Sequence, residues 1–232
     1  MNRRPKRIWI TRASPAAEKT AERVRSLGHE ALVAPLLAIR PVAAEPLDLS
    51  DVGALAFTRA NGVHAFADAS PNRGLPVFAV GEATARAARQ AGFKRVFSTN
   101  GDVAALAAGI AARRRELKGC VLHPGAAELA GDLVGGLTAR GVQARGVALY
   151  ETVIQPPSEE ILAALPGLDA VLIHSPKAAR ALAAVLAEHP APHLRILAIS
   201  PAALRPLESI PASAKAAPPF PLEAALLNLI DR

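Results

Sequence analysis

Cysteine and aromatic residues are scarce in this sequence of 232 residues. Cys120 is the only cysteine, so no disulfide can form within the chain, and we expect a reducing cytoplasm. Aromatics make up 3% of the residues, so the core must consist of Ala, Val, Leu and Ile. No apolar run approaches the roughly 18 residues that span a bilayer, and Ile8–Ile10 is too short for a signal peptide. We therefore expect a soluble intracellular protein with no membrane partner.

Several motifs of cofactor and metal chemistry are also missing. The sequence has no glycine-rich phosphate loop of the Walker or dinucleotide type. The six histidines are scattered and the cysteine stands alone, so no metal site is expected. No serine flanked by glycines predicts a nucleophile elbow. What remains is a reaction that needs no cofactor and no metal, or no reaction at all.

The charge balance favours an anionic partner. The formal net charge is +7, from 27 Lys and Arg against 20 Asp and Glu, which suits nucleic acid or an acidic small molecule. The run Arg113–Arg115 has no aromatic residues interleaved with it and ends an Ala-rich helical stretch. We interpret it as a solvated helix end and expect no nucleic-acid partner.

Short apolar runs alternate with helical stretches along the chain. This order is typical of α/β proteins with parallel sheets covered by helices on both faces. Strands are predicted at residues 7–11, 31–33, 54–58, 77–80, 119–123, 143–146, 170–174 and 196–199. Helices are predicted at residues 15–27, 61–69, 83–91, 103–115, 127–140, 158–165, 176–188 and 221–230.

The pattern occurs twice, which indicates a duplicated domain. Residues 7–39 resemble residues 119–153: each has a strand, a turn with a proline, a helix, a glycine and a second strand. Leu55–Thr58 resembles Val171–His174, and Phe78–Ala83 resembles Leu197–Ala202. Three matches in the same order favour duplication over chance. Two small open sheets are thus predicted.

Open parallel sheets bind ligands beyond the carboxyl ends of their strands. The turns at these ends are rich in hydrogen-bond donors, and each precedes a helix whose free N–H groups attract anions. The surface between two such faces would suit a polyanion. The turns hold Thr11, Arg12, Thr58, Arg59, Asn61, Gly81, Thr84, His123, His174, Ser175, Lys177 and Ser200.

At these residues the chain resembles the uroporphyrinogen-III synthase family, from about Ile8 to Leu229. The matching motifs are Thr11-Arg12, Phe57–Val63, Ala79–Ala85, the tyrosine at Tyr150, and Ser175-Pro176. Two departures stand out: Arg59 replaces the usual serine, and Ser200–Ala203 replaces a Gly-x-Thr-Thr turn. Any hydroxyl role at Ala202 and Ala203 is therefore lost or replaced.

The resemblance implies two similar α/β domains joined by a two-stranded linker. One domain would comprise residues 1–36 and 156–232, and the other residues 42–148. The linkers would be residues 37–41 and 149–155. Pro41 and the pair Pro156-Pro157 suit such crossings.

The resemblance also implies the activity. Family members cyclise hydroxymethylbilane, a linear tetrapyrrole with acetate and propionate arms, to uroporphyrinogen III, with loss of water and inversion of the last ring through a spiro intermediate. The implied partner is this polycarboxylate substrate, with a transient hand-over from the preceding enzyme of the pathway, and the protein would be a cytoplasmic monomer. Holding the two ends of the substrate in the right geometry would supply most of the catalysis.

The site residues each have a functional and a structural interpretation. Arg12, Arg59 and Lys177 would pair with substrate carboxylates, or are ordinary solvated charges. The hydroxyl residues would contact substrate, cap helices, or do both. Gly81 would let a carboxylate approach the backbone, or permit a tight turn. Tyr150 is the candidate general acid, or an aromatic residue that packs at the linker. The hydroxyl residues are Thr11, Thr58, Thr84, Ser175 and Ser200, with the Asn61 amide beside them.

Two other functions fit the same sequence features. A two-lobed protein that binds a small molecule without catalysis would have the same architecture. A nucleic-acid-binding protein would fit the charge, but Trp9 lies in a predicted core strand and no stacking aromatics accompany the basic residues.

Overall fold

Five parallel strands form the first sheet of the computed structural model, which describes residues 4–42, 46–128 and 131–232. Their order is β11-β10-β9-β1-β2, and every neighbouring pair is parallel. The strands are β1 (Arg7–Ile10), β2 (Glu30–Val33), β9 (Ala170–Ile173), β10 (Arg195–Ala198) and β11 (Ala214–Ala216).

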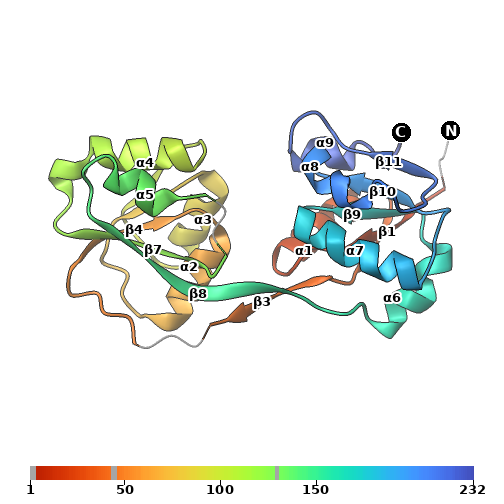
Figure 1. Cartoon of the computed structure of the whole chain (residues 1–232), viewed down its shortest axis with the longest axis horizontal. Helices are drawn as coiled ribbons and strands as arrows, with labels where there is room; N and C mark the ends of the chain where they lie inside the picture. The colour runs from red at the N-terminus through yellow and green to blue at the C-terminus, as the bar shows by residue number, and fades with distance from the viewer. Residues whose placement is uncertain (1–3, 43–45, 129–130) are drawn as a thin grey trace. The chain divides into compact units, whose positions relative to one another are not determined.

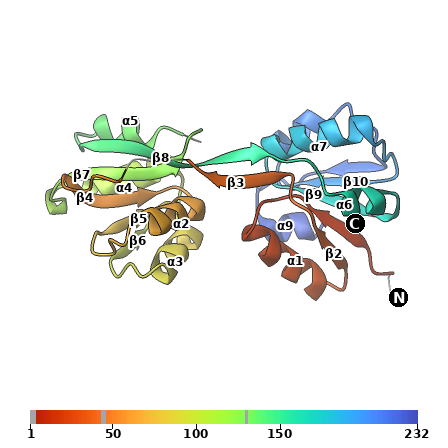
Figure 2. The same ribbon diagram turned by 90° about the horizontal axis from the view of Figure 1, so that it is seen from below.

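The second sheet has six strands among the described residues, in the order β3-β8-β7-β4-β5-β6 (Figure 2). The pairs β7–β8, β4–β7, β4–β5 and β5–β6 are parallel. At the other edge, Val42 N–H donates to Leu149 O and Gln155 N–H donates to Leu36 O, so β3 and β8 run in opposite directions. The strands are β3 (Leu37–Pro41), β4 (Val52–Phe57), β5 (Val77–Ala79), β6 (Val96–Ser98), β7 (Cys120–Ala126) and β8 (Ala144–Ile154).

Helices cover both faces of the first sheet because its strands are apolar on both faces. In β1, Ile8 and Ile10 belong to one core cluster and Trp9 belongs to the other. The first cluster is completed by α1 (Ala16–Ser26) and α9 (Glu223–Leu227). The second is completed by α6 (Glu159–Ala164), α7 (Pro176–Glu188) and α8 (Pro201–Leu204), with short 3₁₀ turns at Leu165–Gly167 and Arg205–Leu207.

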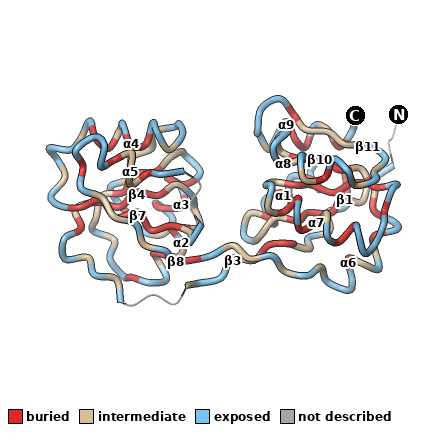
Figure 3. The backbone as a smooth tube through the Cα atoms, in the orientation of Figure 1, coloured by how far each residue is buried: buried red, intermediate tan, exposed pale blue. Residues whose placement is uncertain are grey.

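The second sheet follows the same rule. Leu55 and Phe57 of β4 pack with α2 (Ala60–Ala69) and α3 (Glu82–Gln90), whereas Ala54 and Ala56 pack with α4 (Val103–Ala112) and α5 (Leu133–Thr138). A 3₁₀ turn, Arg114–Glu116, follows α4. Figure 1 shows α4 and α5 on one side of the strands and α2 on the other. The central strands are buried and the connecting loops are more exposed (Figure 3).

The chain divides into two compact units, Met1–Ile39 with Val153–Arg232, and Arg40–Thr152. The first sheet belongs to the first unit and most of the second sheet to the second unit; the chain crosses between the units within β3 and again within β8. The predicted fold class, two similar parallel α/β domains with a two-stranded linker, is confirmed. Among the described residues, no helix is long and apolar enough to cross a membrane.

Candidate functional site

The carboxyl ends of β1, β9 and β10 lie at one edge of the first sheet because these strands are parallel. This edge is called the first carboxyl edge. The segments that follow these strands, from the loops into the first turn of α7, hold six of the residues singled out in the sequence: Thr11, Arg12, His174, Ser175, Lys177 and Ser200.

Three hydroxyl groups at this edge have structural partners. Thr11 is completely buried, and its Oγ1 donates to Leu172 O at 2.8 Å, which ties the end of β1 to β9. Ser175 and Ser200 are half-buried and cap α7 and α8 by accepting from Ala178 N and Ala203 N, at 3.1 and 3.2 Å. Lys177 is half-buried in the first turn of α7. The capping hydroxyls therefore mark the helix N-termini that face this edge.

Arg12 meets a carboxylate that the sequence did not point to. Its Nη1 lies 3.2 Å from Glu223 Oε2 and 3.2 Å from Thr20 Oγ1. His174 Nε2 lies 3.0 Å from the same Glu223 oxygen. Burial lowers the pKa of Arg12, the negative charge of Glu223 raises it, and the nearby Arg23 lowers it. Glu223 and Thr20 are candidate site residues that the sequence interpretation missed.

The carboxyl ends of β4, β5 and β7 lie at the corresponding edge of the second sheet, the second carboxyl edge. Thr58 and Arg59 follow β4, and Arg59 is the N-cap residue of α2. Gly81 follows β5 and is the N-cap residue of α3. Neither N-cap residue makes a side-chain capping bond, so first-turn N–H groups of α2 and α3 keep their capacity to donate to a ligand.

The remaining side chains of this edge differ in exposure. Arg59 is exposed, and it forms no ion pair within the part of the chain that the structure describes. Thr58 and Asn61 are half-buried, and Thr84 is buried in the first turn of α3. Arg59 is thus the cation of this edge best placed to meet a soluble anion.

Gly81 has extended backbone with φ −164°, which any residue can adopt. A Cβ built on it would have no atom within 4 Å outside its immediate neighbours. Neither turn geometry nor packing in the folded chain requires a glycine here. The open space above the α3 N-terminus therefore favours the interpretation in which a ligand approaches the backbone.

Tyr150 lies in β8 opposite Ala126, the last residue of β7, and so belongs to the second carboxyl edge. Its side chain is nearly buried, with the residue 3% exposed. Burial raises the pKa of the Tyr150 hydroxyl, while the positive charge of Arg59 lowers it. The hydroxyl therefore stays protonated at neutral pH and can donate a hydrogen bond or a proton.

His123 has a structural role in β7. It is buried, and its Nδ1 lies 2.8 Å from Ala56 O of the neighbouring strand. Because a carbonyl oxygen can only accept, Nδ1 carries the proton. Burial lowers the pKa of His123, and the bond to Ala56 only partly opposes this. His123 is thus a neutral ring bonded to the backbone inside β7, and it does not lie in the strand-end turn where the sequence placed it.

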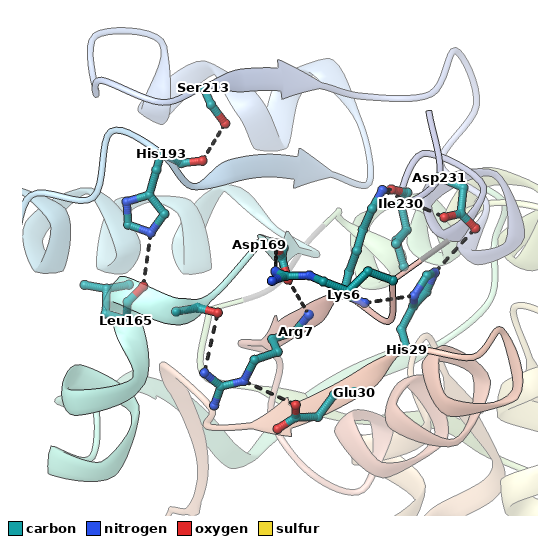
Figure 4. Close-up of polar contacts among 12 residues, drawn as sticks. Lys6, Arg7, His29, Glu30, Leu165, Asp169, His193, Ser213, Ile230 and Asp231 are labelled. Atoms are coloured by element: carbon teal, nitrogen blue, oxygen red, sulfur yellow. Dashed lines mark hydrogen bonds and ion pairs between the residues drawn. The ribbon is translucent and has the colours of Figure 1, made fainter. Parts of the chain in front are cut away.

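The amino edge of the first sheet, opposite the first carboxyl edge, is occupied by charges that pair with each other (Figure 4). Arg7 Nε lies 3.2 Å from Glu30 Oε2, and the Arg7 N–H donates to Asp169 Oδ2 at 2.7 Å. His29 Nδ1 accepts from Lys6 N at 3.3 Å. These contacts tie the N-terminal segment to the sheet, which is a structural role.

One cavity lies at the amino edge of the first sheet, and another lies beside β6, up to the carboxyl end of that strand. One, of about 550 Å³, opens at the amino edge beside Arg7, Glu30 and His193. The other, of about 480 Å³, lies beside β6, where Arg113 stacks on the Phe97 ring at 4.1 Å from its centroid. The carboxyl edges are the candidate site because their donors are arranged around helix N-termini, whereas the amino-edge charges already have partners. No group of three potential metal ligands occurs among the described residues.

The fold and these edges define a two-unit α/β protein whose strand-end loops offer N–H and guanidinium donors to an anion. A model of the family described as Uroporphyrinogen-III synthase HemD matches residues 18–228. The chain therefore belongs to the uroporphyrinogen-III synthase family, and it is an enzyme, a cyclising lyase of haem biosynthesis.

Solved structures support the fold. The chain is similar to uroporphyrinogen-III synthetase from Helicobacter pylori, with a TM-score of 0.68, 19% identity and 98% of each chain covered. It is also similar to a mutant uroporphyrinogen III synthase from the extremely thermophilic bacterium Thermus thermophilus, with a TM-score of 0.51, 17% identity and 98% of each chain covered. The search of curated proteins found no match.

Proposed function

We propose that this enzyme binds hydroxymethylbilane through the loops of its two carboxyl edges and closes it to uroporphyrinogen III. The substrate is a flexible chain of four pyrroles with acetate and propionate arms, so its recognition requires several separate anion-binding groups. The family supports the reaction, and the donors at each edge support the mode of binding.

The observation that carries this mode of binding is the pair of N-termini at the second carboxyl edge. Helices α2 and α3 begin directly after the neighbouring strands β4 and β5, and neither start is capped by a side chain. In contrast, α7 and α8 are capped by Ser175 and Ser200. Two adjacent uncapped N-termini attract anions through their N–H groups and helix dipoles.

We assign complementary roles to the side chains at the second edge. Arg59 pairs with a substrate carboxylate, and Thr58, Asn61 and Thr84 supply polar contacts around it. Gly81 leaves space for a second carboxylate to reach the N–H groups of α3.

At the first edge, Arg12 and Lys177 meet substrate carboxylates, beside the capping hydroxyls of Ser175 and Ser200. Thr11 acts indirectly in this proposal: it is fully buried, and its bond to Leu172 O fixes the strand end that carries Arg12.

Catalysis in this proposal depends mainly on geometry. The bound carboxylates hold the two ends of the substrate in place for closure through the spiro intermediate. Because the ends are already oriented, the reaction step does not carry the entropy cost of bringing them together. Tyr150 donates a proton to the leaving hydroxyl, a contribution of about 10²–10⁴-fold in rate for general acids. Its buried, protonated hydroxyl near Arg59 supports this role.

The test is incubation with freshly generated hydroxymethylbilane, followed by separation of the type I and type III products. We expect mainly type III product, and we expect Arg59→Gln to raise KM by about tenfold, as loss of a charge-assisted hydrogen bond implies. Arg140→Gln is the matched control. Arg140 follows α5, is exposed, and donates from Nη1 to Gly136 O within that helix, so it has no place in the proposed site. A product mixture equal to that in buffer would refute the proposal.

We further propose that the enzyme acts in the cytoplasm as a monomer and receives its substrate by transient hand-over from the preceding enzyme. The domains are proposed at residues 1–36 with 156–232 and at 42–148, with linkers 37–41 and 149–155. Light scattering and limited proteolysis with mass spectrometry test the oligomeric state and these bounds. A dimer in solution, or first cleavage inside either domain, would contradict them.

A further inference from the structure

Four side chains from separate segments meet at the first carboxyl edge. Arg12 follows β1, Thr20 lies in α1, His174 follows β9, and Glu223 is the first residue of α9. Thr20 Oγ1 donates to Glu223 Oε1 at 2.6 Å, while Arg12 Nη1 and His174 Nε2 both reach Oε2, at 3.2 and 3.0 Å. Both carboxylate oxygens of Glu223 therefore have partners.

These contacts keep Glu223 ionised. Burial alone would raise the pKa of its carboxyl group, but the hydrogen bonds and charges from His174, Thr20 and Arg12 lower it to about 2. The side chain is only 18% exposed. A carboxylate that is charged at neutral pH and bonded through both oxygens is poorly suited to transfer protons, but it can hold its neighbours in place.

Arg12 retains binding capacity in this arrangement. Only its Nη1 is engaged by Thr20 and Glu223, and its Nε and Nη2 make no hydrogen bond within the described residues. Its side chain is 31% exposed. Because a guanidinium has donors on three nitrogens in one plane, fixing Nη1 orients the others.

His174 gives a second sign that the cluster serves more than stability. Its side chain is 9% exposed, and its Nδ1 is the one buried side-chain polar atom without a partner among the described residues. Such an unsatisfied atom costs about 1–3 kcal/mol. An unsatisfied buried group in a native structure calls for an explanation, and a role in a functional site is one such explanation.

Docking of α9 also has an apolar basis. Leu226, Leu227 and Ile230 are buried against the first sheet and hold the helix by apolar contact. Buried ion pairs are weak stabilisers compared with apolar residues of similar size, because both charges lose their hydration. Stability that these charges contribute could be supplied as well by apolar residues of similar size, so stability alone does not account for their presence.

We propose that Glu223 is a positioning residue, which holds Arg12 oriented to bind a carboxylate of the tetrapyrrole substrate, with His174 fixed beside it. The inference rests on the proposed function, and it adds to that function a residue that never touches the substrate. Thr20 bridges the two residues, because its Oγ1 accepts from Arg12 Nη1 and donates to Glu223 Oε1.

The test is a double-mutant cycle with Glu223→Gln, Arg12→Gln and the double variant, measured as KM and kcat for hydroxymethylbilane together with the type III fraction. We expect Glu223→Gln to raise KM about fivefold and to leave kcat within about twofold, since only a ground-state contact is loosened. Arg12→Gln should raise KM about tenfold. If Glu223 acts through Arg12, the double variant will match Arg12→Gln alone.

Controls separate positioning from folding. Glu30→Gln removes the Arg7 ion pair at the amino edge of the same sheet and should leave KM unchanged. Glu223→Asp keeps the charge and should recover part of the lost affinity. Should Glu223→Gln fail to fold, Thr20→Val takes its place, because it removes only the bridging hydroxyl; we expect KM to rise about threefold.

Three results would overturn the inference while the proposed function stands. They are an unchanged KM in folded Glu223→Gln, full additivity in the double variant, or, where the Gln variant does not fold, an unchanged KM in Thr20→Val. Absence of type III product from the unaltered enzyme would refute the proposed function and the inference together.

Discussion

Gly62, in the first turn of α2, packs directly against Pro124 of β7. A Cβ built on Gly62 would lie only 2.6 Å from Pro124 O, a distance that real Cβ atoms essentially never show. The backbone oxygen cannot move aside like the end of a long side chain. The close approach therefore fixes the α2 N-terminus beside the second carboxyl edge.

Gly62→Ala should destabilise the second unit. The added methyl group must push α2 away from β7, and overpacking of this kind costs about 1–3 kcal/mol. Urea unfolding followed by near-ultraviolet circular dichroism of Tyr150, the only tyrosine, measures the loss. An unchanged unfolding midpoint would show that α2 can shift without cost.

Gly81→Ala, in contrast to Gly62→Ala, should leave stability unchanged and weaken substrate binding. Its Cβ would enter open space and its φ of −164° suits alanine, so the free energy of unfolding should stay within about 0.5 kcal/mol. The methyl group would occupy the space proposed for a substrate carboxylate, so KM should rise about tenfold. Steady-state kinetics beside the same urea measurement check both parts. A normal KM would remove the anion site above α3.

Tyr150→Phe should slow turnover by about 10²-fold, the lower range for loss of a general acid, and should keep type III selectivity. Selectivity survives because the bound geometry, and not proton donation, selects the isomer. The phenyl ring keeps the packing of a residue that is 3% exposed, so stability should change little. Measurement of kcat and separation of the type I and type III products test this role. An equal loss of rate and selectivity would show that Tyr150 positions the substrate.

The strands of both sheets could largely be predicted because they are apolar on both faces. Ala170–Ile173 is apolar throughout and fully buried, and such a run has few alternatives in an α/β chain. The edge strands Val96–Ser98 and Ala214–Ala216 were missed. They are three residues long and contain Ser98 or Lys215, so they carry neither an apolar run nor a clear alternation.

The strand-end positions of the site could be predicted for a simple reason: in parallel sheets, chain order decides which loops share an edge. Arg12 and Arg59 both follow predicted strands. Glu223 could not be found in this way, because it is 211 positions from Arg12 and 49 from His174. In the sequence it is an acidic residue in a helix's first turn, which the helix dipole alone would explain.

Glu223 also predicts how the first unit responds to acid. The pKa of its carboxyl group is about 2 in the fold, against 4.5 for the ordinary group. The stabilisation is therefore fully present above about pH 4.5 and is lost as the pH falls towards 2, because the unfolded chain takes up the proton first. The difference between these two pKa values corresponds to a contribution of at most about 3 kcal/mol to the free energy of unfolding at neutral pH.

Trp9, the only tryptophan, is buried in β1 and reports on this unit by fluorescence. Urea unfolding at pH 6, 4 and 3 should show a falling stability in the unaltered enzyme and a much flatter profile in Glu223→Gln. Glu30→Gln, which loses an exposed ion pair at the amino edge, should keep the steep profile. Identical slopes for Glu223→Gln and the unaltered enzyme would mean that the carboxylate is not held as the contacts with Arg12, Thr20 and His174 require.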